Sequence, residues 1–294
     1  MRRPNPGRSA HGAWPTSITC VWSSNMAIPP FLKTIAQAPY YRTNWHDALR
    51  EVPAAFQFKR HRIEDPAEFL AELDIDPAAA FSGFQGWRPI LEDAIRRVKA
   101  AEGHQGACSI EDGMILYGLC RALKPRVVIE TGVAAGISTS FIGAAMAENG
   151  SGMHYSIELP PADVNPDRKR HDDGGEFAWP RGGVGWAIPE QVKAGLGKRH
   201  RLILEDVRIA LPRLLDQVGP VDLFFHDDLH TPAQMRWQFR LVWPRIAPGG
   251  VLAADDANIG WIDFCREFGL SQRMFSNVQR LTAVRKPATV GLVQ

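Results

Sequence analysis

The sequence predicts an α/β protein with a doubly wound, mostly parallel sheet of seven strands, preceded by a helical N-terminal cap. Three observations lead to this prediction. Short β-rich apolar runs alternate with helical segments from about residue 107 onward. The runs are apolar along most of their length, as strands covered on both faces are. Several of them end in carboxylates, and in such sheets ligands bind at the carboxyl ends of the strands.

Composition excludes several classes of protein. The net charge of +2, from 34 basic and 32 acidic residues among 294, gives no electrostatic case for nucleic acid or an anionic membrane as a partner. No run approaches the roughly 20 apolar residues that a membrane-spanning helix needs. The four cysteines are scattered without a CxxC pair or zinc spacing, which is typical of reduced thiols in a cytoplasmic protein. A homo-oligomer is compatible with all of this.

The chain divides into three parts. Residues 1–26 carry three arginines and no acidic residue, and they lack both a structural period and the apolar core of a secretory signal. We expect a disordered tail or sequence upstream of the real start at Met26, with a transit-like peptide as the less favoured alternative. Residues 27–105 are expected to form the helical cap, and residues 106–294 the α/β domain.

The cap region carries helix start and stop signals. Asp65, Pro66 and Glu68 give the segment 65–73 an N-cap, a proline at the first helical position and a capping-box acid. Segment 88–103 places its apolar residues on one face and ends at Gly103. No catalytic spacing occurs here, so we expect a cover for the following domain, with a share in ligand binding as the alternative.

The α/β region follows in regular order. Ser109 and Asp112 start a helix that stops at Pro125. The expected strands are 126–132, 153–159, 201–207, 221–227 and 250–256. Helices are expected between and after them, over 138–148, 210–219, 231–243 and 261–269. The stretch 280–293 has the pattern of a closing hairpin around Lys286 and Pro287.

The most specific stretch is VVIETGVAAGISTSFIGAAM (127–146). Gly132 and Gly136 bracket a tight strand-to-helix turn, where backbone can approach a ligand and amides are exposed. The pattern E-x-G-x-x-x-G-x-S differs from the dinucleotide pattern G-x-G-x-x-G. The second strand ends in Glu158, whose carboxylate can accept hydrogen bonds from two ribose hydroxyls, and the third ends in Glu205 and Asp206. Glycines followed by these acids in register predict a nucleoside-containing cofactor.

Two later strands end in crowded acids, FFHDDLH (224–230) and GVLAADD (250–256). Crowded carboxylates are costly unless something positive lies among them. Asp227, Asp255 and Asp256 are hard oxygen donors that suit Mg²⁺, which would leave coordination positions for two substrate oxygens. Taken singly, each is equally well explained as a strand-end or capping residue.

Histidines accompany the first of these acid groups. His230 follows Asp227 by three residues and is interpreted as a general base with an ordinary pKa of about 6.5, or as a structural histidine that bonds a loop carbonyl. His226 alternates with Asp227 along the strand, so we expect it to face the other way as a structural residue.

Residues 107–294 resemble the class I S-adenosylmethionine-dependent methyltransferases, and within them the metal-dependent O-methyltransferases of the catechol, caffeoyl-CoA and macrocin types. The resemblance rests on ETGVAAGIS, the strand-end Glu158, EDV, VDLFFHDDLH and PGGVLAADDAN. It implies S-adenosylmethionine as the cofactor, bound by Glu130, Gly132, Gly136, Ser138, Glu158 and Asp206. It also implies Mg²⁺ or another divalent cation at Asp227, Asp255 and Asp256. Many relatives have D-G-D-H where this chain has Asp227-Asp228-Leu229-His230, so the acid at the third position is absent.

The segment 160–198 is far longer than the usual connection of two to six residues. It is interpreted as a lid or acceptor-binding insertion, with a surface loop as the alternative. Trp179 and Trp186 would stack on an acceptor or anchor the segment to the core.

The expected function is Mg²⁺-assisted O-methyl transfer to a small hydroxylated acceptor, such as a sugar or a natural-product intermediate. Two alternatives stay open. One is a methyltransferase-fold protein that binds a ligand or partner without catalysis, and the other is a metal-independent methyltransferase. The fold alone does not separate them.

Overall fold

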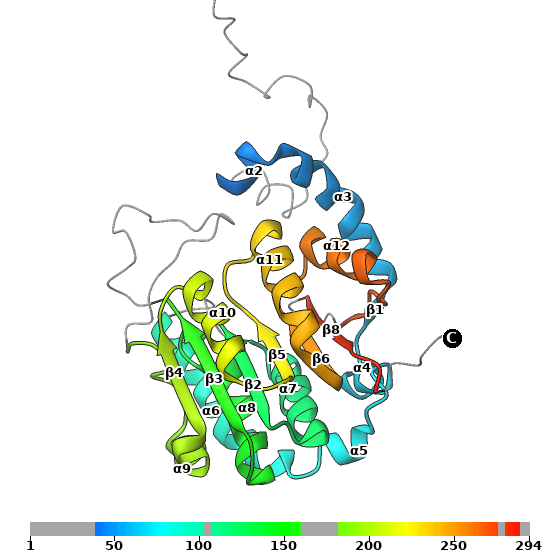
Figure 1. Ribbon diagram of the computed structural model, residues 1–294. Helices are drawn as coiled ribbons and strands as arrows, with labels where there is room; N and C mark the ends of the chain where they lie inside the picture. The colour runs from blue at the N-terminus through cyan, green and yellow to red at the C-terminus, as the bar shows by residue number, and fades with distance from the viewer. Residues whose placement is uncertain (1–38, 103–107, 160–181, 276–279, 289–294) are drawn as a thin grey trace, which may run out of the picture.

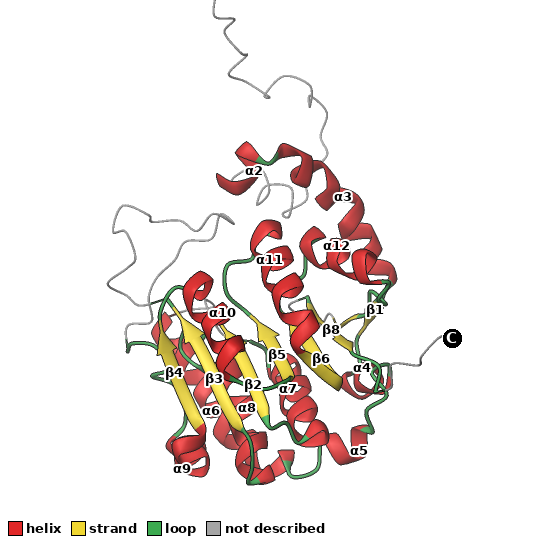
Figure 2. Cartoon of the chain, in the orientation of Figure 1, coloured by secondary structure: helices red, strands yellow, loops and turns green. Residues whose placement is uncertain are grey.

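The computed structural model describes residues 39–102, 108–159, 182–275 and 280–288, so the predicted tail lies outside the described residues. Figures 1 and 2 show a sheet with helices on both faces. The sheet has the order β1-β7-β8-β6-β5-β2-β3-β4. Its strands are β1 (Arg62–Ile63), β2 (Val127–Thr131), β3 (Met153–Glu158), β4 (His200–Leu204), β5 (Val221–His226), β6 (Ile246–Ala254), β7 (Met274–Phe275) and β8 (Leu281–Arg285).

The sheet is doubly wound, as the sequence predicts. From β2 the chain moves outward through β3 and β4, then returns to place β5 on the other side of β2 and continues to β6. All of these pairs are parallel, and only β8 runs antiparallel to its neighbours β6 and β7. The direction of winding therefore changes between β2 and β5, which is where open α/β sheets bind their ligands.

Two details differ from the prediction. Among the described residues the sheet has eight strands rather than seven, because Arg62 and Ile63 pair parallel to β7, a strand that was not predicted either. Two residues between helices carry no strand signal, so this pairing depends entirely on the tertiary fold. At the other end of the chain, β8 pairs with β6 and β7, and the expected second arm of the hairpin lies outside the described residues from 289 onward.

Three helices begin where the sequence places their caps. Asp65 accepts a hydrogen bond from the amide of Ala67, Ser109 from Asp112, and Thr231 from Gln234. The α-helices are α2 (Pro39–Thr43), α3 (Trp45–Arg60), α4 (Pro66–Ala71), α5 (Pro77–Ala80), α6 (Phe84–Glu102), α7 (Ile110–Leu123), α8 (Ile137–Asn149), α9 (Glu190–Leu196), α10 (Val207–Gln217), α11 (Pro232–Val242) and α12 (Ile259–Phe268); two short 3₁₀ turns are η2 (Gly197–Arg199) and η3 (Trp243–Arg245).

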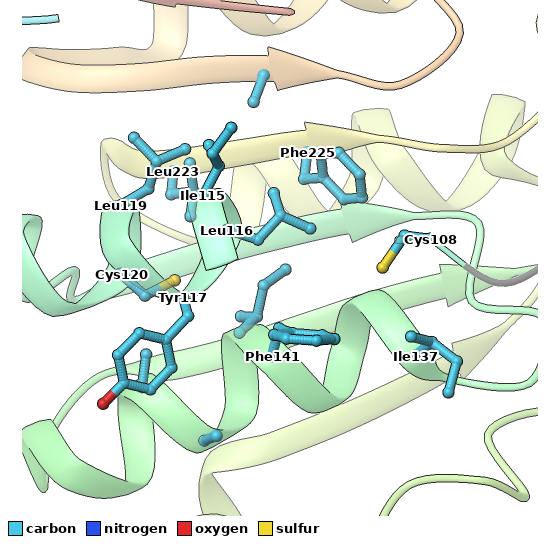
Figure 3. Close-up of a cluster of buried hydrophobic side chains, with 14 of the residues drawn as sticks. Cys108, Ile115, Leu116, Tyr117, Leu119, Cys120, Ile137, Phe141, Leu223 and Phe225 are labelled. Atoms are coloured by element: carbon cyan, nitrogen blue, oxygen red, sulfur yellow. The ribbon is translucent and has the colours of Figure 1, made fainter. Parts of the chain in front are cut away.

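Alternation along the strands creates two hydrophobic cores. Leu223 and Phe225 of β5 point to the layer that contains α7 and α8, as Figure 3 shows. Phe224, between them, packs into the opposite layer, which holds α10, α11, α12 and part of α3. Both faces of the central strands are thus covered, which explains why the sequence of these strands is continuously apolar.

The described residues agree with the compositional expectations on thiols. Cys108, Cys120 and Cys265 are buried and form no disulfide. Within the described ranges no helix is both long and apolar enough to cross a membrane.

Candidate active site

The turn after β2 requires glycine at two positions. Gly132 and Gly136 have φ values of 85° and 92°, in the left-handed region that favours glycine. A Cβ on Gly132 would lie 2.0 Å from the carbonyl oxygen of Asp227, and one on Gly136 would lie 2.5 Å from Cγ1 of Ile188. Backbone thus approaches other chain segments closely on both sides of the turn, and the turn brings the end of β2 against the end of β5.

Glu158 organises this turn. One oxygen of its carboxylate, Oε2, accepts hydrogen bonds from the amides of Val133 (2.7 Å) and Ala134 (2.8 Å), and Oε1 accepts one from Leu159 (2.9 Å). Burial raises the pKa of Glu158, and the three amides oppose that shift. A carboxylate offers about four acceptor positions, so capacity for a ligand hydroxyl is left.

Glu130 lies beneath the turn and is fully buried. It accepts hydrogen bonds from the hydroxyls of Ser138 (2.6 Å) and Thr139 (2.8 Å), and its Oε2 lies 3.2 Å from Nε2 of His154. Burial alone would raise the pKa of Glu130, but the hydrogen bonds from His154 and the hydroxyls outweigh it and lower the pKa. Glu130 and Ser138, expected to line the pocket, face each other inside the protein and support the turn from below.

Asp206, which follows strand β4, caps helix α10. Its carboxylate accepts a hydrogen bond from the amide of Arg208 at 2.8 Å and pairs with the Arg208 guanidinium, which lowers its pKa. Glu205 pairs in turn with Arg213. In this arrangement both acids of the EDV motif have partners within α10.

The acids of the two later strand ends do come together. Asp227 donates its amide to the carbonyl of Thr131 at 2.7 Å, and Asp255 donates its amide to the carbonyl of His226 at 2.9 Å. His230 lies between two of the carboxylates, with Nε2 3.5 Å from Oδ1 of Asp227 and Nδ1 3.7 Å from Oδ2 of Asp256. We call Asp227, His230, Asp255 and Asp256 the acid cluster.

Charge in the acid cluster changes the acidity of its members. Burial raises the pKa of Asp255 well above its usual range, and the neighbouring Asp227 and Asp256 raise it further. Burial lowers the pKa of His230, but the carboxylates more than offset this and raise it to about 10. The ordinary pKa expected for His230 is therefore wrong for this arrangement, because the sequence does not show how many carboxylates surround the imidazole ring. At neutral pH the imidazolium supplies positive charge among the acids.

The acid cluster offers suitable donors for a divalent cation but is not arranged around one. Asp255 is 3% exposed, and its Oδ1 has no hydrogen-bond partner among the described residues. Three hard oxygen donors with an unpaired buried oxygen suit Mg²⁺ chemically. However, within the described part of the chain no group of three or more His, Cys, Asp or Glu side chains is placed to hold a metal ion. The carboxylates would have to close around a cation.

Two residues behind the acid cluster, Asp228 and Gln238, were given no role from the sequence. Asp228 accepts a hydrogen bond from Nε2 of Gln238 at 2.6 Å and lies 3.0 Å from Nε2 of His226. Gln238 in turn accepts a hydrogen bond from the hydroxyl of Thr131 at 3.0 Å. His226 is thus a buried structural histidine, and Asp228 turns away from the acid cluster.

The described end of the long insertion packs on the glycine turn. The amides of Gly185 and Ala187 donate to the carbonyls of Ala134 and Ala135 at 2.8 and 2.9 Å. Arg97 lies over the ring of Trp186 at 5.8 Å, so this tryptophan anchors the segment to helix α6. Trp179 lies outside the described residues, and so does the rest of the predicted lid up to residue 181.

Comparison with known proteins shows similarity to methyltransferases. A family model described as "Methyltransferase domain", methyltransferase family 24, matches residues 129–257. Curated proteins from Mycobacterium sp. strains JLS and KMS, each named "Putative O-methyltransferase", are 28% identical over 217 residues, covering 69% of this chain and 86% of each relative. By these matches the chain is an S-adenosylmethionine-dependent methyltransferase.

Solved structures are similar to this methyltransferase at lower identity. A structure from Klebsiella pneumoniae, described as a "putative O-methyltransferase", matches with a TM-score of 0.48 at 15% identity, over 68% of this chain and 90% of that one. The O-methyltransferase TomG from Streptomyces achromogenes, solved with S-adenosylmethionine, matches with a TM-score of 0.44 at 17% identity, over 67% and 89%.

The segment matched by the family model contains both halves of the candidate site. It begins inside β2, before the glycine turn, and ends one residue after Asp256. Helix α3 lies outside it.

We expect Glu158→Ala to weaken S-adenosylmethionine binding by roughly 1–3 kcal/mol, because the turn loses its amide acceptor and the ribose hydroxyls lose a charged one. Titration calorimetry measures the effect. Glu190→Ala is the matched control, since its side chain is 85% exposed on α9. Unchanged affinity in Glu158→Ala would remove this residue from the cofactor site.

Proposed function

We propose that the chain transfers the methyl group of S-adenosylmethionine to a hydroxyl oxygen of a small acceptor. The observation that carries the proposal is the close contact between Gly132 and Asp227. Because of this contact, the turn from Gly132 to Gly136, which we call the cofactor turn, and the acid cluster lie at one edge of the sheet. A cofactor on the turn would therefore have the cluster beside it. Oxygen as the accepting atom is supported by the names of the curated relatives.

The proposed cofactor site consists of residues that would contact the cofactor and of residues that would support the turn from beneath. Gly132, Gly136 and the amides of the turn would approach the cofactor, and Glu158 would accept hydrogen bonds from the ribose hydroxyls. Asp206 would lie near the adenine, at the end of the adjacent strand. The residues beneath the turn, Glu130 and Ser138, would act by fixing its shape.

The proposed reaction is a direct displacement. The acceptor oxygen attacks the methyl carbon; the new C–O bond forms as the C–S bond breaks, and the products are a methyl ether and S-adenosylhomocysteine. The hydroxyl proton passes to the acid cluster. We assign His230 to proton handling, because it connects Asp227 with Asp256. Positioning of the two reactants supplies much of the acceleration in such a step.

A divalent cation is the second part of the proposal. Asp227, Asp255 and Asp256 would hold Mg²⁺, supported by their accumulated charge and by the unpaired Oδ1 of Asp255. A cation there lowers the pKa of a hydroxyl that coordinates it. Without a cation, His230 would supply the positive charge that offsets the carboxylates among the described residues.

Methyl transfer is tested with isotopically labelled S-adenosylmethionine and a panel of catechols, monosaccharides and aliphatic diols, read by mass spectrometry. We expect labelled methyl ethers and stoichiometric S-adenosylhomocysteine. His230→Gln should lower turnover about 10²–10⁴-fold, the usual contribution of a positioned acid–base group, while cofactor affinity is retained. His61→Gln, the same change at an exposed site, should keep the wild-type rate. Wild-type turnover in His230→Gln would remove this residue from the reaction.

Removing metal tests the cation directly. We expect excess chelator to abolish turnover on any acceptor found in the panel and added Mg²⁺ to restore it, because the cation offsets the carboxylates around the reacting hydroxyl. Cofactor binding, measured by calorimetry in the same buffer, should survive. Full turnover in chelator would favour the metal-independent alternative.

A further inference from the structure

We propose that Glu51, on helix α3, is a positioning residue for the acid cluster. Its carboxylate holds the first residue of helix α12 and, through it, the loop 255–259 that carries two of the acids. The inference rests on the proposed function, because that function gives the cluster its role in methyl transfer. It assigns a catalytic-site task to a helix outside the segment matched by the family model.

The loop 255–259 is fixed at its start by neighbouring strands. The amide of Asp255 donates to the carbonyl of His226, and the amide of Ala257 donates to the carbonyl of Arg280 at 3.1 Å. Between these two anchors Asp256 adopts a φ of 47°, uncommon for a residue with a side chain. Such a conformation persists only where the surrounding contacts determine it.

The second half of the loop is held by side chains. Asn258 caps helix α12 by accepting a hydrogen bond from the amide of Gly260 at 2.7 Å, and its Nδ2 donates to the carbonyl of His230 at 2.7 Å. The next amide, that of Ile259, donates to Oε1 of Glu51 at 3.3 Å. Of the anchors described here, this is the one that comes from the N-terminal region.

Glu51 is unusual because it is a carboxylate in the protein interior, only 5% exposed. Its Oε1 also accepts a hydrogen bond from the hydroxyl of Tyr41 at 2.8 Å. Burying a carboxylate is costly, and an apolar side chain would fill the same space without that cost. The location explains the carboxylate, because negative charge is stabilised at the N-terminus of a helix, here α12.

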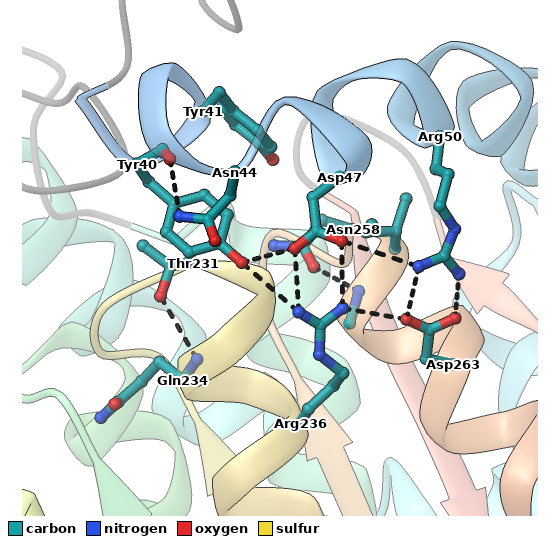
Figure 4. A network of polar contacts seen from close by, with 12 residues as sticks. Tyr40, Tyr41, Asn44, Asp47, Arg50, Thr231, Gln234, Arg236, Asn258 and Asp263 are labelled. Carbon is teal, nitrogen blue, oxygen red and sulfur yellow. Dashed lines mark hydrogen bonds and ion pairs between the residues drawn. The ribbon is translucent and has the colours of Figure 1, made fainter.

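Helix α3 is itself held firmly to the helices that follow the two acid-bearing strands. Figure 4 shows Arg236 of α11 between Asp47 of α3 and Asp263 of α12, at 2.8 and 2.9 Å. Arg50 of α3 also pairs with Asp263. Glu51 lies on this fixed helix, so its carboxylate can hold the loop 255–259 in a defined position.

The test compares Glu51→Ala with Glu51→Gln in the full chain. In Glu51→Ala we expect the amides of 255–260 to exchange hydrogen about tenfold faster or more, because the loop loses an anchor. Turnover on an acceptor from the panel should fall about 10²-fold through kcat, the effect expected of a displacement of about 1 Å, while S-adenosylmethionine affinity stays within about twofold. Glu51→Gln should recover most of both losses, because its amide oxygen still accepts from Ile259.

Two further variants complete the experiment. Glu64→Ala removes an exposed glutamate and should match the wild type in every measurement. Tyr41→Phe removes only the hydroxyl oxygen that donates to Glu51, and it should accelerate hydrogen exchange of the amides of 255–260. This variant keeps the proposal testable if Glu51→Ala fails to fold. Wild-type rates of hydrogen exchange in both Glu51→Ala and Tyr41→Phe would overturn the proposal. It would also be overturned if Glu51→Gln showed the same hydrogen exchange and turnover as Glu51→Ala. If the wild type methylates no compound in the panel, the proposed function loses support, but the exchange measurement still decides the role of Glu51.

Discussion

The close contact between Gly132 and Asp227 is the constraint on which the rest of the site depends. The strands β2 and β5 are neighbours at the point where the winding of the sheet reverses, and the amide of Asp227 donates to the carbonyl of Thr131 at 2.7 Å. A side chain at position 132 would overlap the Asp227 carbonyl. Because glycine allows the contact, the cofactor turn and the first acid of the cluster share one edge of the sheet.

Two sets of charged side chains lie on either side of this contact and are balanced differently. Beneath the turn, Glu130 is surrounded by hydroxyls and His154, which keep its pKa low and give the turn a fixed support. In the acid cluster the carboxylates outnumber His230, and an oxygen of Asp255 has no partner among the described residues. In the first set both oxygens of Glu130 accept hydrogen bonds from hydroxyls, as in a structural network. The second leaves charge available for a reaction.

Much of the architecture follows from local sequence signals. Apolar runs predicted the central strands, and the caps at Asp65, Ser109 and Thr231 predicted the starts of three helices. The meeting of Asp227 with Asp255 was predictable too, because parallel strand ends lie at one edge of a sheet. All of these features depend on residues close in sequence or on the general geometry of parallel sheets.

The remaining features depend on contacts between distant parts of the chain. Glu51 lies 208 residues from Ile259, and no local pattern indicates that pair. The inward direction of Glu130 and the raised pKa of His230 depend on side chains contributed by several elements. Strand β1 likewise forms only because β7 lies beside it. Sequence patterns place residues on elements, whereas burial and charge arise only once the elements pack together.

A crystal structure of the complex with S-adenosylhomocysteine would test the central claim most directly. We expect the ribose hydroxyls on the Glu158 carboxylate, the homocysteine portion along the turn at Gly132 and Gly136, and the sulfur facing Asp227 and His230. A ligand bound away from the turn, or one with its sulfur directed away from the acid cluster, would contradict it.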